Sequence, residues 1–177
     1  KEWGEAIKDY DRVIQLDASC TIAYMGRGEA KLRLKDYDGA IRDLNEAVRL
    51  DPSNPLAYFT RGYAKDKLGR QQDAKGDYNL AVQFKDNAAS NRLLPLVYKV
   101  RGMLEQSLGE SGAAVNDLDE AVRLKYTDAE LYSARGDANR DLGNLREALK
   151  DYDEAVRMRP IFPEVYYKRG CVNRTLK

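Results

Sequence analysis

A 34-residue period runs along the chain and constrains its fold more than any other feature. The phrase Tyr-x-x-Arg-Gly has copies that begin at Tyr24, Tyr58, Tyr98, Tyr132 and Tyr166. In a second phrase, an Ala is followed by Asp after three residues and by Ala or Val after seven. Its copies begin at Ala6, Ala40, Ala74, Ala114 and Ala148, and they are 34, 34, 40 and 34 residues apart. Such a period is typical of repeat proteins, in which each unit packs mainly against its neighbours.

Each period reads as two helices. In residues 55–88, apolar side chains recur at three- and four-residue spacing around Phe59 and again around Tyr78, as on one face of a helix. No segment alternates like a strand over a useful length, so the sequence predicts an all-α fold. Glycines mark the break between the two helices of a repeat. These glycines are Gly69, Gly109 and Gly143.

The repeat boundaries follow from this scheme. Pro55, Pro95 and Pro163 stand at first helical positions, where a missing N–H costs nothing. We predict about ten helices in a single array over residues 1–177, and we expect the array to be a piece of a longer protein. The complete repeats are 21–54, 55–88, 95–128 and 129–162, residues 1–20 are the second helix of a partial repeat, and 163–177 are the first helix of another.

Residues 89–94 are an insertion that explains the single step of 40 residues. The insertion either extends a helix or forms a loop that offsets the next repeat. The simpler interpretation is a tolerated surface insertion, because extra loop length adds little to the entropy of closing a chain. The alternative is a bulge that contacts a partner.

A glycine recurs in the middle of every first helix, where it costs about 1 kcal/mol relative to alanine. A sequence that repeats this cost five times is expected to need the missing side chain. We predict close approach of the two helices of a repeat at this point. The glycines are Gly28, Gly62, Gly102, Gly136 and Gly170, and the alanines expected opposite them are Ala40, Ala74, Ala114 and Ala148.

This pattern resembles the tetratricopeptide repeat, which has a period of 34 residues and conserved Trp, Gly, Tyr, Ala, Phe and Pro places. Here tyrosine fills the Trp place, the five glycines fill the Gly place, and Pro52 and Pro160 fill the closing Pro place. The resemblance covers essentially the whole chain. It implies antiparallel helix pairs stacked into a right-handed superhelical solenoid, with a concave groove lined by the first helices.

Arginine replaces the Leu of the family's Leu-Gly pair in every copy, and an aspartate follows each first Ala. We expect the Asp of one repeat to meet the Arg of the next, in partly buried bidentate pairs that fix the stacking. The competing arrangement joins Arg27 and Asp43 within one repeat, and a ligand-binding row of arginines is a further interpretation. The expected pairs are Asp9–Arg27, Asp43–Arg61, Asp77–Arg101, Asp117–Arg135 and Asp151–Arg169.

The family's geometry implies which residues of the first helices line the groove. The second, fifth, ninth, twelfth and thirteenth residues of each helix are expected there, so the groove is predicted to be apolar in the early repeats and charged in the later ones. Aromatic and methionine side chains suit a binding surface for a partner's apolar groups. The alternative is packing against neighbouring helices. The candidate groove residues are Met25, Phe59, Tyr63, Leu96, Lys99 and Met103.

A chaperone C-terminal tail is a disfavoured partner. Members of the family that bind such tails hold the terminal carboxylate with a clamp of Lys and Asn side chains. Lys99 matches the Lys place in one repeat, but Met103 takes its Asn place, and the earlier repeats lack both residues.

The composition of the chain argues against several other classes of function. The chain has no histidine, the commonest general base and metal ligand, and we find no catalytic constellation, metal site or cofactor motif. Its 30 basic and 29 acidic residues argue against a polybasic face for nucleic acid. No stretch is apolar enough to insert in a membrane, and Cys20 and Cys171 are too far apart in an array to pair. We therefore expect an intracellular, cytoplasmic setting.

The expected function is a non-enzymatic scaffold or adaptor that binds a peptide or helix of a protein partner in its groove. One alternative is a structural spacer in a large ciliary, cytoskeletal or organelle assembly. Another is a regulatory module of a larger enzyme. The identity of the partner does not follow from the sequence.

Overall fold

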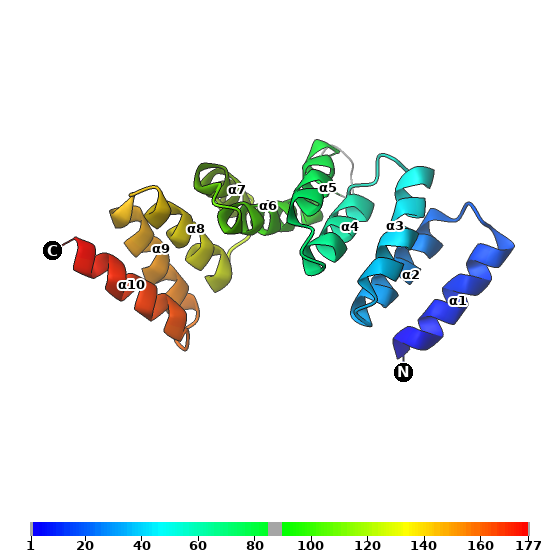
Figure 1. The fold of residues 1–177 in the computed structure, drawn as a ribbon, viewed down its shortest axis with the longest axis horizontal. Helices are drawn as coiled ribbons and strands as arrows, with labels where there is room; N and C mark the ends of the chain where they lie inside the picture. Colours follow the sequence, from blue (N-terminus) through cyan, green and yellow to red (C-terminus); the bar gives the residue numbers. More distant parts are fainter. Residues whose placement is uncertain (1, 85–89, 177) are drawn as a thin grey trace. The chain divides into compact units, whose positions relative to one another are not determined.

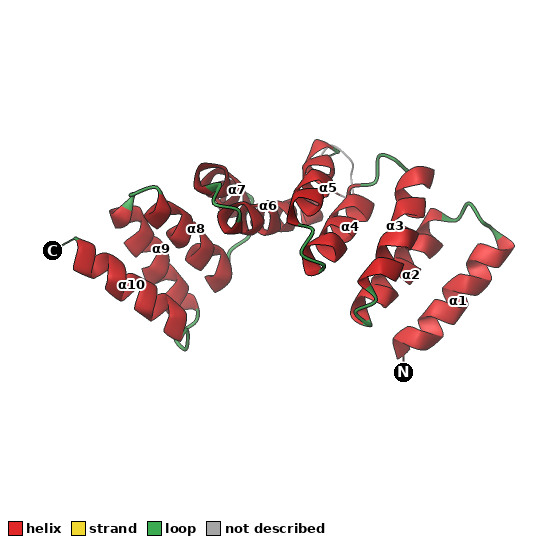
Figure 2. Cartoon of the chain, viewed as in Figure 1, coloured by secondary structure: helices red, strands yellow, loops and turns green. Residues whose placement is uncertain are grey.

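The computed structural model describes residues 2–84 and 90–176, which form ten α-helices (Figure 1). The predicted all-α fold is confirmed, since the described residues contain no strand (Figure 2). The helices are α1 Glu2–Leu16, α2 Thr21–Arg33, α3 Tyr37–Leu50, α4 Pro55–Lys67, α5 Gln71–Gln83, α6 Ser90–Ser107, α7 Ser111–Arg123, α8 Ala129–Asp141, α9 Leu145–Met158 and α10 Pro163–Thr175.

The chain divides into two compact units, residues 1–93 (unit 1) and 94–177 (unit 2). In unit 1, the consecutive helices α1 to α5 pack against one another in chain order. In unit 2, the consecutive helices α7 to α10 do the same. The helices therefore pack in consecutive pairs, as the repeat predicts. A single right-handed array over the whole chain stays a prediction.

Local sequence signals explain where the helices begin and end. Asn54 caps α4 by accepting hydrogen bonds from the N–H groups of Leu56 and Ala57, and Asp128 caps α8 by accepting one from Leu131. The predicted glycine breaks are confirmed, because the three glycines between paired helices have φ angles of 76–80°. Such angles place them in the left-handed region, where a side chain is unfavourable.

Proline marks the start of α4 and of α10, but the same prediction for Pro95 is wrong. Helix α6 begins at Ser90, so residues 90–94 extend this helix and Pro95 lies inside it. Pro95 is the sixth residue of α6, beyond the first four N–H groups that lack a partner within a helix, so it removes one backbone hydrogen bond from this helix. Residue 89, the remaining part of the predicted insertion, lies outside the described residues.

Small residues let the paired helices approach closely, as predicted. A Cβ atom added at Gly62 would lie 2.8 Å from Tyr78 Cε1 and 3.2 Å from the carbonyl oxygen of Ala74. At Gly136 it would lie 2.7 Å from Tyr152 Cε1. Both tyrosines are fully buried, so their rings cannot move aside. The contact therefore includes a large side chain four residues after the alanine, in addition to the alanine itself.

We expect opposite effects from the same substitution at two equivalent glycines of unit 2. Gly136→Ala should destabilise the chain by about 1–3 kcal/mol, because the new methyl group overlaps the buried Tyr152 ring. Gly170→Ala should stabilise it by up to about 1 kcal/mol, since nothing lies within 4 Å of its added Cβ and alanine favours helix. Urea unfolding measures both, and equal effects at the two positions would contradict the close-packing explanation.

Candidate functional site

The arginines of the repeated Tyr-x-x-Arg-Gly phrase, called the ladder arginines below, form forked ion pairs in four repeats, each with an aspartate of its own repeat. Arg27 donates from Nε and Nη2 to the two carboxylate oxygens of Asp43, at 2.9 and 2.6 Å. Arg61 holds Asp77 at the same two distances. The equivalent pairs in unit 2 are Arg101–Asp117 and Arg135–Asp151. These hydrogen bonds raise the pKa of Arg27 further above its ordinary value, so the guanidinium stays charged.

The predicted pairing between repeats is therefore wrong, and the alternative pairing within a repeat is correct. The partner lies 16 residues after each arginine, across the turn of one helical hairpin. Asp9 is exposed, and the arginine 16 residues before it would fall before residue 1. The pairs that the structure replaces are Asp9–Arg27, Asp43–Arg61, Asp77–Arg101, Asp117–Arg135 and Asp151–Arg169.

Three of these arginines, Arg27, Arg61 and Arg135, also contact the preceding repeat, through a residue that the sequence analysis did not select. Arg27 Nη1 lies 2.6 Å from Asp11, and Arg135 Nη1 lies 2.7 Å from Asp119. Arg61 Nη1 donates to Asn45 at 2.9 Å. Each of these partners lies 16 residues before its arginine. The expected aspartate was two residues earlier, which is a rotation of about 200° around a helix and points a side chain away.

In unit 1, the three groove candidates lie on the first helices α2 and α4. Tyr63 is 39% exposed, and Lys67 Nζ lies 4.9 Å from the centre of its ring. Phe59 is half-buried and packs against Tyr78, with 5.8 Å between the ring centres. Met25 is half-buried, and its sulfur lies 3.5 Å from Asn54 Nδ2. Phe59 thus packs on a neighbouring helix while Tyr63 faces solvent.

Two further apolar residues of the same face are exposed to solvent. Ile22 on α2 is 79% exposed and Leu56 on α4 is 42% exposed. They occupy the second places of their repeats, one turn before Met25 and Phe59. Exposed apolar side chains gathered on one face commonly mark an interaction site.

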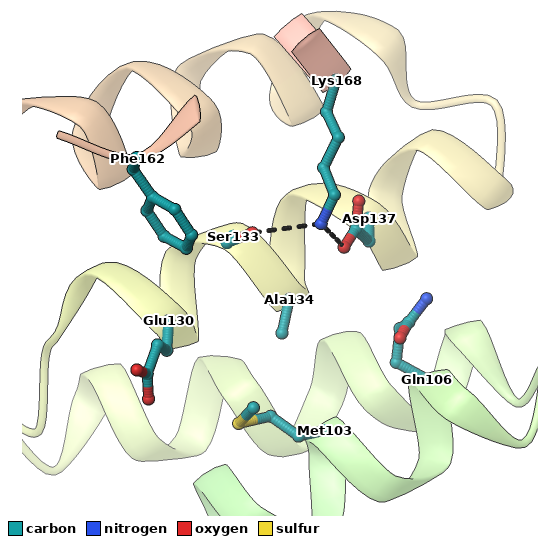
Figure 3. A pocket seen from close by; sticks show the side chains of 8 residues that line it. All are labelled: Met103, Gln106, Glu130, Ser133, Ala134, Asp137, Phe162 and Lys168. Carbon is teal, nitrogen blue, oxygen red and sulfur yellow. Dashed lines mark hydrogen bonds and ion pairs between the residues drawn. The ribbon is translucent and has the colours of Figure 1, made fainter. Parts of the chain in front are cut away.

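In unit 2, the first helices form a pocket of about 200 Å³ (Figure 3). Met103 and Gln106 come from α6, Ser133 and Asp137 come from α8, and Lys168 comes from α10. Phe162, just before α10, and Met103 supply apolar surface on opposite sides of the opening (Figure 3). The other lining residues are Glu130 and Ala134.

A buried hydrogen-bonded network forms one wall of this pocket. Asp137 accepts a hydrogen bond from Tyr152 Oη at 2.9 Å. It also forms an ion pair with Lys168 Nζ at 2.6 Å. Lys168 Nζ also lies 3.4 Å from Ser133 Oγ. Burial and the neighbouring Asp137 carboxylate raise the pKa of Tyr152, so its hydroxyl remains a donor. The network joins α8, α9 and α10 and leaves the lysine at the edge of the pocket.

Only one of the three groove candidates in unit 2 lines the pocket. Met103 does so, and Leu96 lies half-buried on α6. Lys99 is buried, with Nζ 2.6 Å from Asp128 and 3.4 Å from Glu130. Burial is the largest single effect and lowers the pKa of Lys99, but the hydrogen bond and charge of Asp128, with Tyr126 and Glu130, together raise this pKa above its ordinary value, so the ammonium is held in an internal ion pair. Lys99 is therefore removed from the groove candidates.

The sequence analysis missed Lys168 and Phe162. Lys168 is the sixth residue of α10, whereas the groove is expected at the second, fifth, ninth, twelfth and thirteenth. Phe162 precedes the helix and was outside the scheme altogether. The Lys168 side chain reaches α8 because it forms an ion pair with Asp137. A rule based on residue spacing within one helix cannot predict such a contact between helices.

Two other kinds of site were searched for within residues 2–84 and 90–176. No group of three or more acidic or cysteine side chains there could hold a metal ion. None of the helices in that part of the chain is long and apolar enough to cross a membrane.

Comparison with known proteins decides the family. A family model described as TPR repeat, the tetratricopeptide repeat, matches residues 28–69 and 136–173. The chain is a TPR repeat protein. No curated protein sequence matches it. TPR proteins are generally protein-interaction modules.

Solved TPR structures share the fold. YrrB, described as a TPR protein with an unusual peptide-binding site, aligns with a TM-score of 0.83 and 19% identity over 94% of this chain and 82% of its own. A MamA structure aligns with a TM-score of 0.78 and 23% identity over 89% of each chain. MamA from Desulfovibrio magneticus RS-1 has a TM-score of 0.78 and 20% identity, over 88% of this TPR chain and 84% of its own. At these identities the likeness concerns the fold alone.

A double-mutant cycle distinguishes the two pairings of the ladder. Arg61→Leu should destabilise this TPR protein by about 1–3 kcal/mol, because the buried Asp77 carboxylate loses two hydrogen bonds and keeps only its ion pair with Lys65 Nζ at 2.7 Å. Adding Asp77→Asn should recover part of that loss, with a coupling energy of about 1–3 kcal/mol. Adding Asp43→Asn should give a nearly additive loss, since Asp43 belongs to Arg27. Coupling of Arg61 to Asp43 and not to Asp77 would reverse our assignment.

Removing one hydroxyl from each of two equivalent tyrosines should have unequal effects. Tyr152→Phe should destabilise the protein by about 1–3 kcal/mol, because Asp137 loses a hydrogen bond inside the structure. Tyr78→Phe should change stability by less than about 0.5 kcal/mol, because the structure shows no hydrogen-bond partner for Tyr78 Oη among the described residues. Chemical unfolding of both variants tests this, and an equal loss would show that Tyr78 has a partner.

Proposed function

We propose that this TPR protein is a non-catalytic protein-interaction module that binds a segment of a partner protein on its first-helix faces. The pocket of unit 2 is the observation that carries the proposal. It opens on α6, α8 and α10, the first helices of their repeats, and it is lined by three apolar and five polar or charged residues. The apolar groups can contribute affinity, and the polar groups can orient a bound segment.

The size and polarity of the pocket favour a side chain of a peptide over a free small molecule. About 200 Å³ is below the usual range for small-molecule sites but accommodates one apolar side chain between Met103 and Phe162. Gln106 offers both an amide donor and an amide acceptor at the rim, which suits the main chain of an extended peptide. Lys168 lies next to this rim, where its charge is paired with the Asp137 carboxylate.

The first-helix face of unit 1 supplies a second contact surface in this proposal. Tyr63, Leu56 and Ile22 are exposed there, and Phe59 and Met25 are half-buried beside them. Aromatic side chains contribute disproportionately to binding energy at interfaces. We therefore assign to this face the anchoring of a partner's apolar side chains.

The absence of catalysis is part of the proposal and has two supports. The sequence contains no histidine, which removes the commonest general base. TPR scaffolds are also typically non-catalytic.

The test is selection of dodecapeptides from a random display library on the immobilised 177-residue chain, followed by fluorescence anisotropy. We expect Met103→Glu to weaken peptides bound in unit 2 at least tenfold, because it places a carboxylate beside Glu130 in the pocket. Phe59→Ala should similarly weaken peptides bound in unit 1. Arg123→Ala, at an exposed position of the second helix α7, is the matched control and should leave Kd unchanged.

Two results would contradict the proposal. One is a library from which no peptide binds more tightly than to an unrelated helical protein. The other is a set of peptides whose Kd is unchanged by both groove variants, which would favour a structural spacer with contacts on other faces.

A further inference from the structure

Repeats 55–88 and 129–162 have the same local packing but differ at one decisive position. A Cβ on Gly62 meets the Tyr78 ring as a Cβ on Gly136 meets the Tyr152 ring, so the two tyrosines occupy equivalent places. Tyr152 Oη donates to Asp137 on the neighbouring first helix. The residue equivalent to Asp137 in the earlier repeat is Tyr63.

The hydroxyl of Tyr78 is consequently left without a hydrogen-bond partner among the described residues. Tyr78 is fully buried, so its hydroxyl does not reach solvent water that could accept the hydrogen bond. A buried donor without an acceptor destabilises a protein, and such groups in native structures call for an explanation. An aspartate at position 63 would supply the acceptor, as it does in repeat 129–162.

Tyr63 takes that position and presents its ring to solvent instead. It is 39% exposed on the first-helix face of unit 1, beside Phe59 and one turn from the exposed Leu56. Departures from the locally most stable choice of residue are concentrated at functional sites. The combination of an exposed aromatic ring and an unsatisfied buried donor behind it points to a ligand contact at this place.

We infer that Tyr78 Oη donates a hydrogen bond to a main-chain carbonyl of an extended, apolar partner segment bound across Tyr63 and Phe59. This inference rests on the proposed function and specifies the partner for the face of unit 1. The Tyr63 ring shifts to admit the carbonyl and stacks on the apolar side chain next to it.

The surroundings select an extended segment with a neutral acceptor. Carbonyl oxygens inside a helix are already bonded to N–H groups of their own chain, whereas an extended segment has free ones. A carboxylate acceptor is disfavoured, because it would be repelled by Asp66. Burial, and secondly the Asp66 carboxylate, raise the pKa of Tyr78, which keeps its hydroxyl protonated as a donor.

The exposed side chains of this face have the matching character. Leu56 and Ile22 extend the apolar surface beyond the two aromatic rings. Lys67 already lies over the Tyr63 ring and is available to contact a partner's polar edge. The occupant is therefore an apolar segment in extended conformation, of at least the length that spans α2 and α4.

The probe for the test is a dodecapeptide selected on the chain whose binding is weakened by Phe59→Ala. Its Kd is measured by anisotropy for the unaltered chain and for Tyr78→Phe, with Arg49→Ala on the second helix α3 as the control. We expect Tyr78→Phe to weaken binding five- to tenfold without lowering the Tm, and Arg49→Ala to have no effect. The peptide complex should also show a downfield shift of the Tyr78 hydroxyl proton.

A second variant, Tyr63→Asp, separates the two roles of this position. It recreates the arrangement of Tyr152 and Asp137, so we expect a higher Tm together with a loss of peptide binding of more than tenfold.

The outcomes distinguish this inference from the proposed function. A peptide that depends on Phe59 but has the same Kd for Tyr78→Phe overturns the hydrogen bond and leaves the interaction module intact. A selected peptide that is helical when bound overturns the extended occupant. A library that yields no peptide dependent on Phe59 removes the unit 1 site, and one that yields no binding peptide at all removes both proposals.

Discussion

The forked ion pair between the two helices of a repeat is the contact on which the architecture depends. Single helices of about 13 residues are marginal in water and need tertiary contacts to persist. The cores of both units are built largely from alanine, with few large side chains, so little area is available to hold the helices in register. A guanidinium that bonds one carboxylate with two nitrogens restricts both distance and rotation. Removing the arginine leaves the buried aspartate with fewer hydrogen bonds, although Lys31 and Lys65 still form ion pairs with Asp43 and Asp77.

Several features were predictable because they are encoded within one repeat. The helical period, the glycine breaks and the close approach at Gly62 and Gly136 depend on residues that are near in sequence, and the structure agrees with them. The predicted partner of Arg61 was wrong because the partner depends on which face of the second helix turns toward the first. A two-residue difference in position decides that, and the repeated pattern is compatible with both choices.

The pocket of unit 2 shows a different reason for failure. Met103, Ser133 and Asp137 were within reach of a rule on helix positions, since each sits at a regular place on its own helix. Lys168 was not, because its side chain is carried to α8 by an ion pair that only tertiary structure defines. The start of α6 before Pro95 was not predicted either, because residues 90–94 have only a weak helix signal and fall in the expected insertion.

Arg27, Arg61 and Arg135 each make two contacts at equal and opposite distances along the chain, one 16 residues after and one 16 residues before the arginine. This symmetry makes the repeats exchangeable as genetic units. Excision of residues 21–54 would leave Asp11 sixteen residues before the arginine now numbered 61, in the place that Asn45 occupies. A duplication of the same segment would likewise preserve every pairing distance. Recombination in steps of one repeat can therefore lengthen or shorten such an array while its internal charges remain neutralised.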